Sequence, residues 1–251
     1  MSDIKIAFLI TFMAGISTLI GLFPIFFRFK NENDIVCGAL AFAGGVMFSV
    51  SITDLIPESI SMLSKNLIGI FVVLISFLCV LMGIVLSSFI SKYIDNNNYS
   101  VNSNLYKVGL ISMLAIIIHN IPEGIVTFIS TTKNINLGIS LGIAIALHNI
   151  PEGISISVPI YYSTKSLLKS VGYTLISALS EPLGAVIAYL FLARFINDVI
   201  LGMIFSLIAG IMIQITFNSL LPTSANYKKK KLTAFFFLIG IIFMIIKCVF
   251  F

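Results

Sequence analysis

The sequence predicts an all-α membrane protein in which eight helices cross the bilayer. Three observations support this fold class. Hydrophobic residues make up 59% of the 251 residues and charged residues only 10%, and the mean hydropathy is +1.11. Soluble domains carry about a quarter charged residues, so this chain lacks the polar surface that water requires. Its apolar stretches have the length of membrane-spanning helices, whereas the strands of a membrane barrel are shorter and alternate in polarity.

Polar breaks divide the chain into eight expected spans, which we interpret as one integral membrane domain over residues 1–251. Each span is close to or above the roughly 20 residues that a helix needs to cross the hydrocarbon core. The first apolar run is too long for the core of a signal peptide and ends in Arg28 and Lys30, so we expect it to be retained as a span. The spans are expected at 4–27, 35–62, 66–92, 105–131, 136–162, 166–192, 197–222 and 232–250.

Lysines and arginines are divided unevenly between the two sides that these spans define. With the N-terminus outside, the inward side holds Arg28, Lys30, Lys92, Lys107, Lys165, Lys169 and Lys228–Lys231, and the outward side holds Lys5, Lys65, Lys133, Arg194 and Lys247. Cytoplasmic connections collect positive charge, so both termini are expected outside. The run Lys228–Lys231 also fits a solvated stop signal with no other role. We attribute the net charge of +5 to membrane orientation and expect no nucleic-acid partner.

One seven-residue segment, His-Asn-Ile-Pro-Glu-Gly-Ile, occurs twice, at 119–125 and 148–154. Within each copy, the histidine and the glutamate are four residues apart and therefore project from one helical face. Imidazole and carboxylate groups are suitable ligands for a borderline divalent cation such as Zn²⁺ or Fe²⁺. The asparagine of each copy can add a carbonyl oxygen. The candidate ligands of the two copies are His119, Asn120, Glu123, His148, Asn149 and Glu152.

The two copies are expected to meet near the middle of the membrane. The fourth and fifth spans are joined by a few residues near 133–136, so they form an antiparallel hairpin in which the motifs differ in depth by about 5 Å. Pro122 and Pro151 lack a backbone N–H, so each helix is expected to kink there and leave a carbonyl facing a cavity. The pattern predicts a central cation site that can hold two ions. The alternative is a polar network that only pins two helices.

The sixth span carries a third carboxylate, Glu181, beside Pro182. An unpaired carboxylate in an apolar span is costly. We interpret Glu181 as part of a shared metal site, and the alternative is a structural hydrogen bond.

Other polar side chains in the spans could line a route to and from this site. Asp54 and Glu58, near the outer end of the second span, would attract cations at an entrance or would be solvated interfacial acids. Met47 could add a thioether ligand or belong to the core. Gln214 and Asn218 share a face of the seventh span, where they could line an exit or hydrogen-bond between helices.

The paired His-Asn-Ile-Pro-Glu-Gly segments, the Ser-Glu-Pro-Leu-Gly-Ala segment at 180–185 and the eight spans together resemble the ZIP (Zrt/Irt-like) metal transporters, particularly the bacterial zinc-uptake branch. The resemblance covers essentially the whole chain. It implies import of Zn²⁺, often with Fe²⁺, Mn²⁺, Co²⁺ or Cd²⁺, through the plasma membrane into the cytoplasm. The metal would be the substrate, and no prosthetic group is expected. The resemblance also implies a homodimer, extracellular termini in agreement with the charge distribution, and a transport bundle that moves against a scaffold.

The family pattern also implies roles for individual residues. His119, Glu123, His148 and Glu152 would form the primary site. Asn120, Asn149 and Glu181 would form an adjoining site that shares Glu123 and Glu152. The chain differs from many members in its longest connection, near 93–104, which contains no histidine. We therefore expect no metal sensing through that loop.

Two other classes of function compete with a secondary transporter as interpretations of these residues. The first is a membrane-embedded zinc hydrolase, because histidine and glutamate also build catalytic metal centres. The usual protease helix places glutamate directly after the first histidine, whereas asparagine follows the histidine here. The second is a scaffold that uses the polar residues only to join helices. We expect a transporter and not an enzyme.

Overall fold

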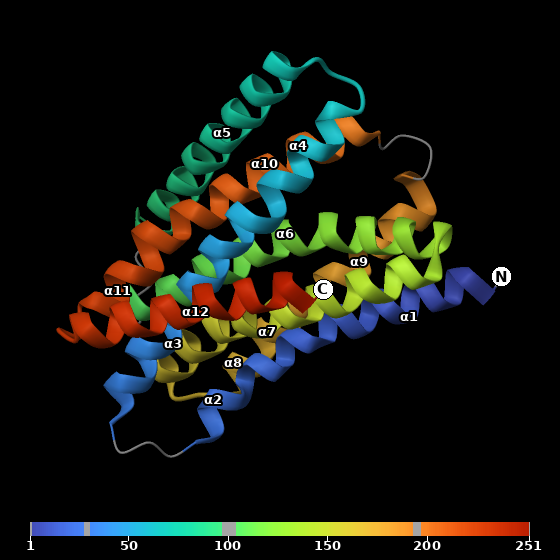
Figure 1. Cartoon of the computed structure of the whole chain (residues 1–251). Coiled ribbons are helices and arrows are strands. Elements are labelled where there is room, and N and C mark those ends of the chain that lie inside the picture. The colour runs from blue at the N-terminus through green and yellow to red at the C-terminus, as the bar shows by residue number, and fades with distance from the viewer. Residues whose placement is uncertain (1, 28–30, 97–103, 193–196, 251) are drawn as a thin grey trace.

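The computed structural model describes residues 2–27, 31–96, 104–192 and 197–250, and within these ranges the chain is helical and contains no strand (Figure 1). The eight expected spans correspond to α1 (Ser2–Ile16) with α2 (Phe23–Phe26), α3 (Glu32–Val50) with α4 (Ile56–Ser64), α5 (Gly69–Asn96), α6 (Asn104–Lys133), α7 (Ile135–Thr164), α8 (Leu167–Ala178) with α9 (Ser180–Ile187), α10 (Asp198–Ile215) with α11 (Leu221–Ala225), and α12 (Lys230–Phe250). Of the sequence features discussed above, Arg28, Lys30, Arg194 and positions 97–103 of the longest connection lie outside the described residues.

The helices have the length and composition of membrane spans, which confirms the all-α membrane fold. Seven helical segments of the described chain are long and apolar enough to cross a bilayer. The eighth, α12, has 21 residues and thus a length of roughly 31 Å, with lysines near its two ends. Asparagine or serine side chains accept hydrogen bonds from the first turns of α3, α7, α8 and α10. These N-caps explain why the helices begin where polar residues interrupt the apolar runs.

Two of the prolines coincide with irregular turns, but the two motif prolines do not. Pro57 and Pro222 follow π-helical turns at Ser51–Leu55 and Thr216–Leu220. A π turn accommodates a residue that cannot donate to the carbonyl four positions earlier. By contrast, α6 and α7 continue as single helices of 30 residues through Pro122 and Pro151. Neither helix is broken at its motif, and each motif proline removes one backbone hydrogen bond from a continuous helix.

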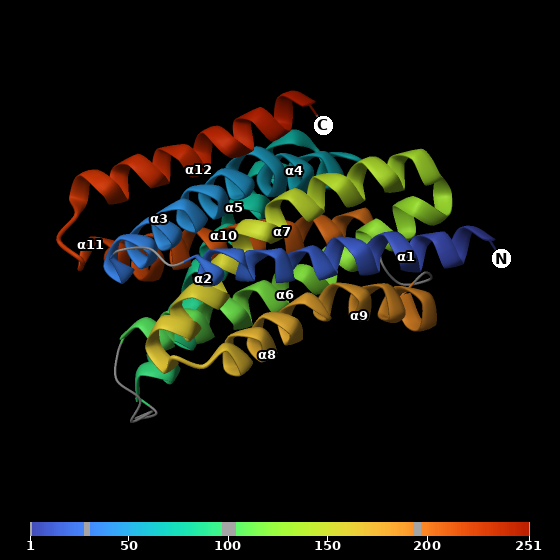
Figure 2. The same ribbon diagram turned by 90° about the horizontal axis from the view of Figure 1, so that it is seen from below.

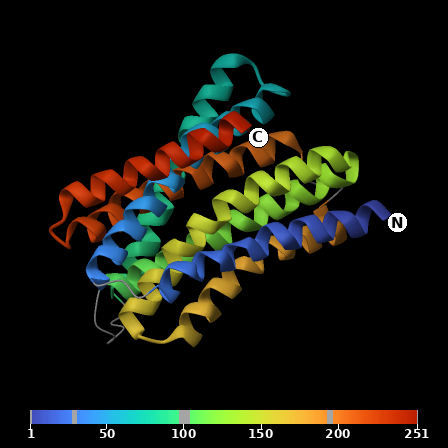
Figure 3. The ribbon, with the colours of Figure 1, turned by 60° about the horizontal axis from the view of Figure 1, so that its bottom comes forward.

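The helices form two groups, which meet mainly where α3 packs on α7 and also where α6 packs on α10 and α5. The motif group contains α1, α2, α6, α7, α8 and α9, and the flanking group contains α3, α4, α5, α10, α11 and α12. Figure 2 shows α7 between α3 and α12 on one side and α8 and α9 on the other. The same division is visible in the view of Figure 3. The hairpin of α6 and α7 is thus covered on both sides by other helices.

Within each group, helices approach so closely that only glycine fits at the contact. A Cβ atom on Gly124 of α6 would lie 1.9 Å from the carbonyl oxygen of Glu181 in α9, and one on Gly153 of α7 would lie 1.9 Å from that of Thr18. In the flanking group, a Cβ atom on Gly83 of α5 would lie 1.9 Å from the carbonyl oxygen of Leu207 in α10. Such contacts place the backbone of Glu181 directly against the helix that carries the first motif. None of the close contacts at the described glycines joins the two groups.

Candidate metal site

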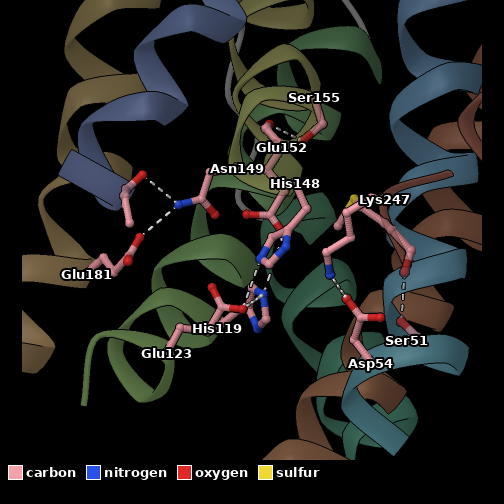
Figure 4. Close-up of polar contacts among 12 residues, drawn as sticks. Ser51, Asp54, His119, Glu123, His148, Asn149, Glu152, Ser155, Glu181 and Lys247 are labelled. Carbon is pink, nitrogen blue, oxygen red and sulfur yellow. Dashed lines mark hydrogen bonds and ion pairs between the residues drawn. The ribbon is translucent and has the colours of Figure 1, made fainter. Parts of the chain in front are cut away.

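The four side chains of the paired motifs meet between α6 and α7 (Figure 4). His119 and Glu123 come from α6, and His148 and Glu152 come from α7. The two imidazole rings have their centroids 6.2 Å apart. None of the four residues is more than 5% exposed. The helical spacing and the short hairpin therefore produce the convergence that the sequence predicts.

The donor atoms of this cluster lie at distances close to those around a bound cation. Glu123 Oε1 is 3.0 Å from His148 Nε2 and 3.2 Å from His119 Nε2, and Glu152 Oε1 is 3.5 Å from His119 Nε2. His119, His148 and Glu152 each offer a ligand atom, and these atoms lie within 4.8 Å of one another. Ligand atoms about 2.1 Å from a Zn²⁺ ion lie at most about 4.2 Å apart. Small side-chain movements would thus suffice to place one ion among them.

Many polar atoms of the cluster have no hydrogen-bond partner within the described part of the chain. These atoms include both carboxylate oxygens of Glu152, Glu123 Oε2, Asn149 Oδ1, and both amide atoms of Asn120. A buried polar atom without a partner costs roughly 1–3 kcal/mol, and such atoms are rare in folded proteins. In a network that served only to join two helices, the polar atoms would form hydrogen bonds with one another. The unpaired oxygens therefore favour a cation site over a structural network.

Glu181 reaches the same region from α9 through Asn149. Asn149 Nδ2 donates to Glu181 Oε2 at 2.7 Å and to the carbonyl oxygen of Ala14 at 2.9 Å. Glu181 is fully buried, and its other carboxylate oxygen, Oε1, has no partner among the described residues. Asn149 Oδ1 and Glu181 Oε1 are therefore two further oxygen donors on the side of the cluster that faces α1. This arrangement contains the hydrogen bond of the structural alternative and also leaves ligand atoms available.

The other polar residues expected along a route have different environments. Met47 is fully buried in the apolar core, which fits the core alternative. Gln214 is buried, accepts a hydrogen bond from Ser87 and donates one to Ser88, so it joins α10 to α5. Asn218 is exposed in the π-helical turn after α10. The wider turn aligns residues five apart instead of four, which explains why Gln214 and Asn218 do not share an environment.

The two acids of the second span also differ. Glu58 is exposed on α4. Asp54 lies in the π-helical turn before α4, accepts a hydrogen bond from Thr53 at 2.8 Å, and forms an ion pair with Lys247 of α12 at 2.5 Å. The side chains of Lys247 and Asp54 are only 10% and 24% exposed.

Lys247 is a candidate functional residue that the sequence reasoning did not single out. Figure 4 draws the Asp54–Lys247 ion pair in the same view as the histidine and glutamate side chains of the motifs. In the sequence, Lys247 is one of several lysines at the ends of apolar runs. Nothing in its spacing indicates that it pairs with a residue of the second span.

These features define a class: a helical membrane protein of seven to eight spans with a buried cluster of histidine, glutamate and asparagine side chains that is a candidate cation site. Comparison with known proteins specifies the family. Residues 95–247 match the ZIP zinc transporter family. The chain is similar to the zinc transporter ZupT of Clostridium perfringens, with 35% identity over 285 aligned residues that cover all of this chain and 98% of that protein. It is also similar to ZupT of Oceanobacillus iheyensis, at 36% identity over 97% of each chain, and of Streptococcus mutans, at 36% identity over 98% of this chain and 97% of the relative.

The chain therefore belongs to the ZIP family, as the repeated motif indicated. Members of this family are membrane transporters and not enzymes, so the zinc-hydrolase alternative is not supported. The matched relatives are bacterial, in keeping with a multi-pass protein of a bacterial membrane.

Proposed function

We propose that this chain carries divalent transition-metal ions into the cytoplasm across a bacterial plasma membrane, with Zn²⁺ as the favoured ion. The observation that supports the proposal is the group of buried nitrogen and oxygen ligand atoms between α6 and α7, most of which have no hydrogen-bond partner among the described residues. The relatives named as zinc transporters support zinc as the substrate. Fe²⁺, Mn²⁺, Co²⁺ and Cd²⁺ are further candidate substrates, since imidazole and carboxylate ligands accept them as well.

In this proposal, His119, Glu123, His148 and Glu152 hold the ion in transit, and Asn120, Asn149 and Glu181 form an adjoining site. The carboxylates replace part of the water shell that the ion loses on entering the membrane, and the ion offsets their buried charge. An interior at −100 mV supplies about 4.6 kcal/mol for each divalent ion that moves inward. We further propose that both termini face outside and that the single membrane domain of residues 1–251 assembles as a homodimer.

Zinc uptake by the purified protein in liposomes tests the proposed function. Vesicles that enclose a zinc-sensitive fluorescent indicator are expected to show saturable inward flux, faster when the interior is made electrically negative. Added Cd²⁺, Fe²⁺ or Mn²⁺ is expected to slow zinc entry in the order of its affinity for the site. Protein-free vesicles and retention of an enclosed dye control for leakage. Flux equal to that of protein-free vesicles would rule out transport.

The Asp54–Lys247 pair leads to a second prediction about the same transport. The Lys247 ammonium pairs with the Asp54 carboxylate, which would otherwise attract an incoming divalent cation. The substitution Lys247→Met is therefore expected to lower the KM for Zn²⁺. Each 1.4 kcal/mol of competition that is removed corresponds to about tenfold in affinity, so the KM is expected to fall severalfold. The measurement is initial uptake rate against zinc concentration.

The matched control for Lys247→Met is Lys65→Met. Lys65 pairs with Asp198 at 3.4 Å, but both side chains are widely exposed, at 56% and 41%. Its substitution is expected to leave KM unchanged. If Lys247→Met leaves KM unchanged or raises it, Lys247 does not compete with the metal. A lower Tm in the same variant would show that Lys247 serves to hold α12 against the π-helical turn at Ser51–Leu55.

A further inference from the structure

A cavity of about 940 Å³ lies at the boundary between the two groups of helices. Its walls are apolar and come from both groups: Pro24 and Ile154 from α2 and α7, and Ala39, Phe42 and Phe236 from α3 and α12. Figure 2 shows these four helices next to one another. The cavity therefore offers an apolar surface to a molecule that enters from the side of the protein.

The same cavity is strongly basic at one end. Among the described residues, its lining includes the whole run Lys228–Lys231 and one carboxylate, that of Asp34. Lys228 has a positive φ of 58° at the turn before α12, and α12 begins at Lys230. Lys229 forms an ion pair with Asp34, while Lys228, Lys230 and Lys231 are exposed. Three exposed cationic side chains are thus gathered where the apolar walls end.

We propose that this cavity binds an anionic phospholipid. An acyl chain matches the apolar walls, and a phosphate-bearing headgroup matches the lysines. Clusters of lysine beside a membrane span attract anionic lipid, each lysine contributing about 1 kcal/mol near the surface. The volume lies within the range of about 300–1,000 Å³ that ligand cavities usually have. A small soluble anion would leave the apolar walls without a partner. The apolar walls and the lysines together therefore favour an amphiphilic ligand.

The position of the cavity gives the lipid a regulatory role. Ile154 lies two residues after Glu152 on α7, and the opposite wall is formed by α3 and α12 of the flanking group. A lipid in this place lies between the helix that carries the second motif and the helices against which it packs. Zinc uptake is therefore expected to depend on anionic lipid. This dependence rests on the proposed transport function, whereas the binding itself does not.

Binding is tested with the full-length protein in detergent, by titration with dioleoylphosphatidylglycerol and, in parallel, dioleoylphosphatidylcholine. Native mass spectrometry counts the bound lipids, and the shift in Tm follows saturation. The anionic lipid is expected to bind more tightly. The double substitution Lys230→Gln/Lys231→Gln is expected to weaken it roughly tenfold or more. The matched control, Lys92→Gln/Lys169→Gln, removes two exposed lysines outside the cavity and is expected to have no effect.

Ala39→Phe tests the apolar part of the site separately. The new phenyl ring fills part of the cavity, while all four lysines of Lys228–Lys231 remain. The affinity for the long-chain lipid is therefore expected to fall at least fivefold. Soluble glycerol phosphate distinguishes a lipid from a free anion and is expected to compete weakly. Three results would each overturn the proposal: equal affinity for the two lipids, equal weakening by the two lysine pairs, or glycerol phosphate binding as tight as the phospholipid.

Uptake into liposomes with and without phosphatidylglycerol then tests regulation. Wild-type flux is expected to be severalfold higher with the anionic lipid, and Lys230→Gln/Lys231→Gln is expected to lose the difference. Saturable binding with lipid-independent flux would overturn the regulatory role and leave the binding site. Absence of zinc flux from the wild type in both lipids would reject the proposed function alone, because lipid binding is measured without transport.

Discussion

Glu152→Gln is expected to abolish saturable zinc uptake and to weaken zinc binding about 100-fold or more. The glutamine has nearly the same shape as the glutamate, so the packing of α7 is retained while the charge is lost. Loss of one partner from a buried charge pair costs roughly 3–5 kcal/mol. Glu152 is fully buried, lies 3.5 Å from His119 Nε2, and has no hydrogen bond to either carboxylate oxygen in the described chain. His148→Ala is expected to have a comparable effect. Isothermal titration and liposome uptake measure the two quantities.

Glu58→Gln provides the matched control, because it removes an exposed carboxylate of α4. It is expected to bind and carry zinc as the wild type does. Glu181→Gln should have a smaller effect than Glu152→Gln, since its carboxamide can still accept the hydrogen bond from Asn149. Uptake by Glu152→Gln or His148→Ala at the wild-type rate would remove the cluster from the transport pathway, although the family assignment would stand.

Gly153→Ala is expected to destabilise the protein and to lower transport, although it adds a single methyl group. The new Cβ atom would lie 1.9 Å from the carbonyl oxygen of Thr18, so α7 must move away from the turn at Ser17–Leu22. Overpacking of a filled core costs typically 1–3 kcal/mol, and this contact is with backbone that cannot rotate aside. Glu152 is the adjacent residue, so the shift also moves a candidate ligand. Thermal unfolding and zinc affinity measure the two effects.

The matched control is Gly172→Ala in α8, where a Cβ atom would meet nothing within 4 Å. Alanine favours a helix over glycine by about 1 kcal/mol, so this variant should be as stable as the wild type or more so. Equal Tm values for Gly153→Ala and Gly172→Ala would show that α7 can separate from the turn at Ser17–Leu22 without cost.

The sequence predicted the fold well because a bilayer permits few solutions. Inside a bilayer the backbone must form its hydrogen bonds within the helix, and a helix needs about 20 residues to cross the hydrocarbon core. The eight apolar runs have about that length. The central cluster was also predictable. A spacing of four residues puts His119 and Glu123 on one helical face, and the short connection to α7 brings the second copy to a similar depth.

The parts that the sequence did not predict depend on contacts between distant segments or on backbone detail. The Asp54–Lys247 pair joins residues that are 193 positions apart, and the local pattern around Lys247 contains no sign of it. The π-helical turn after α10 moved Asn218 out of line with Gln214, although regular helical spacing placed them on one face. A proline indicates an irregularity in a helix, but only tertiary packing decides whether the helix changes its turn, as before Pro57, or continues, as at Pro122.

The tightest glycine contacts lie within the two groups of helices and not between them. Where main chain touches main chain, as at Gly124 and Gly153 or at Gly83, neither helix can slip past the other without a steric clash. Each of these contacts joins helices of the same group. A rearrangement that opens the candidate metal site first to one face of the membrane and then to the other is therefore expected at the boundary between the groups, where α3 packs on α7 and α6 packs on α10. The ion and the helices that hold it would then move together, and the site would become accessible from the other face of the membrane.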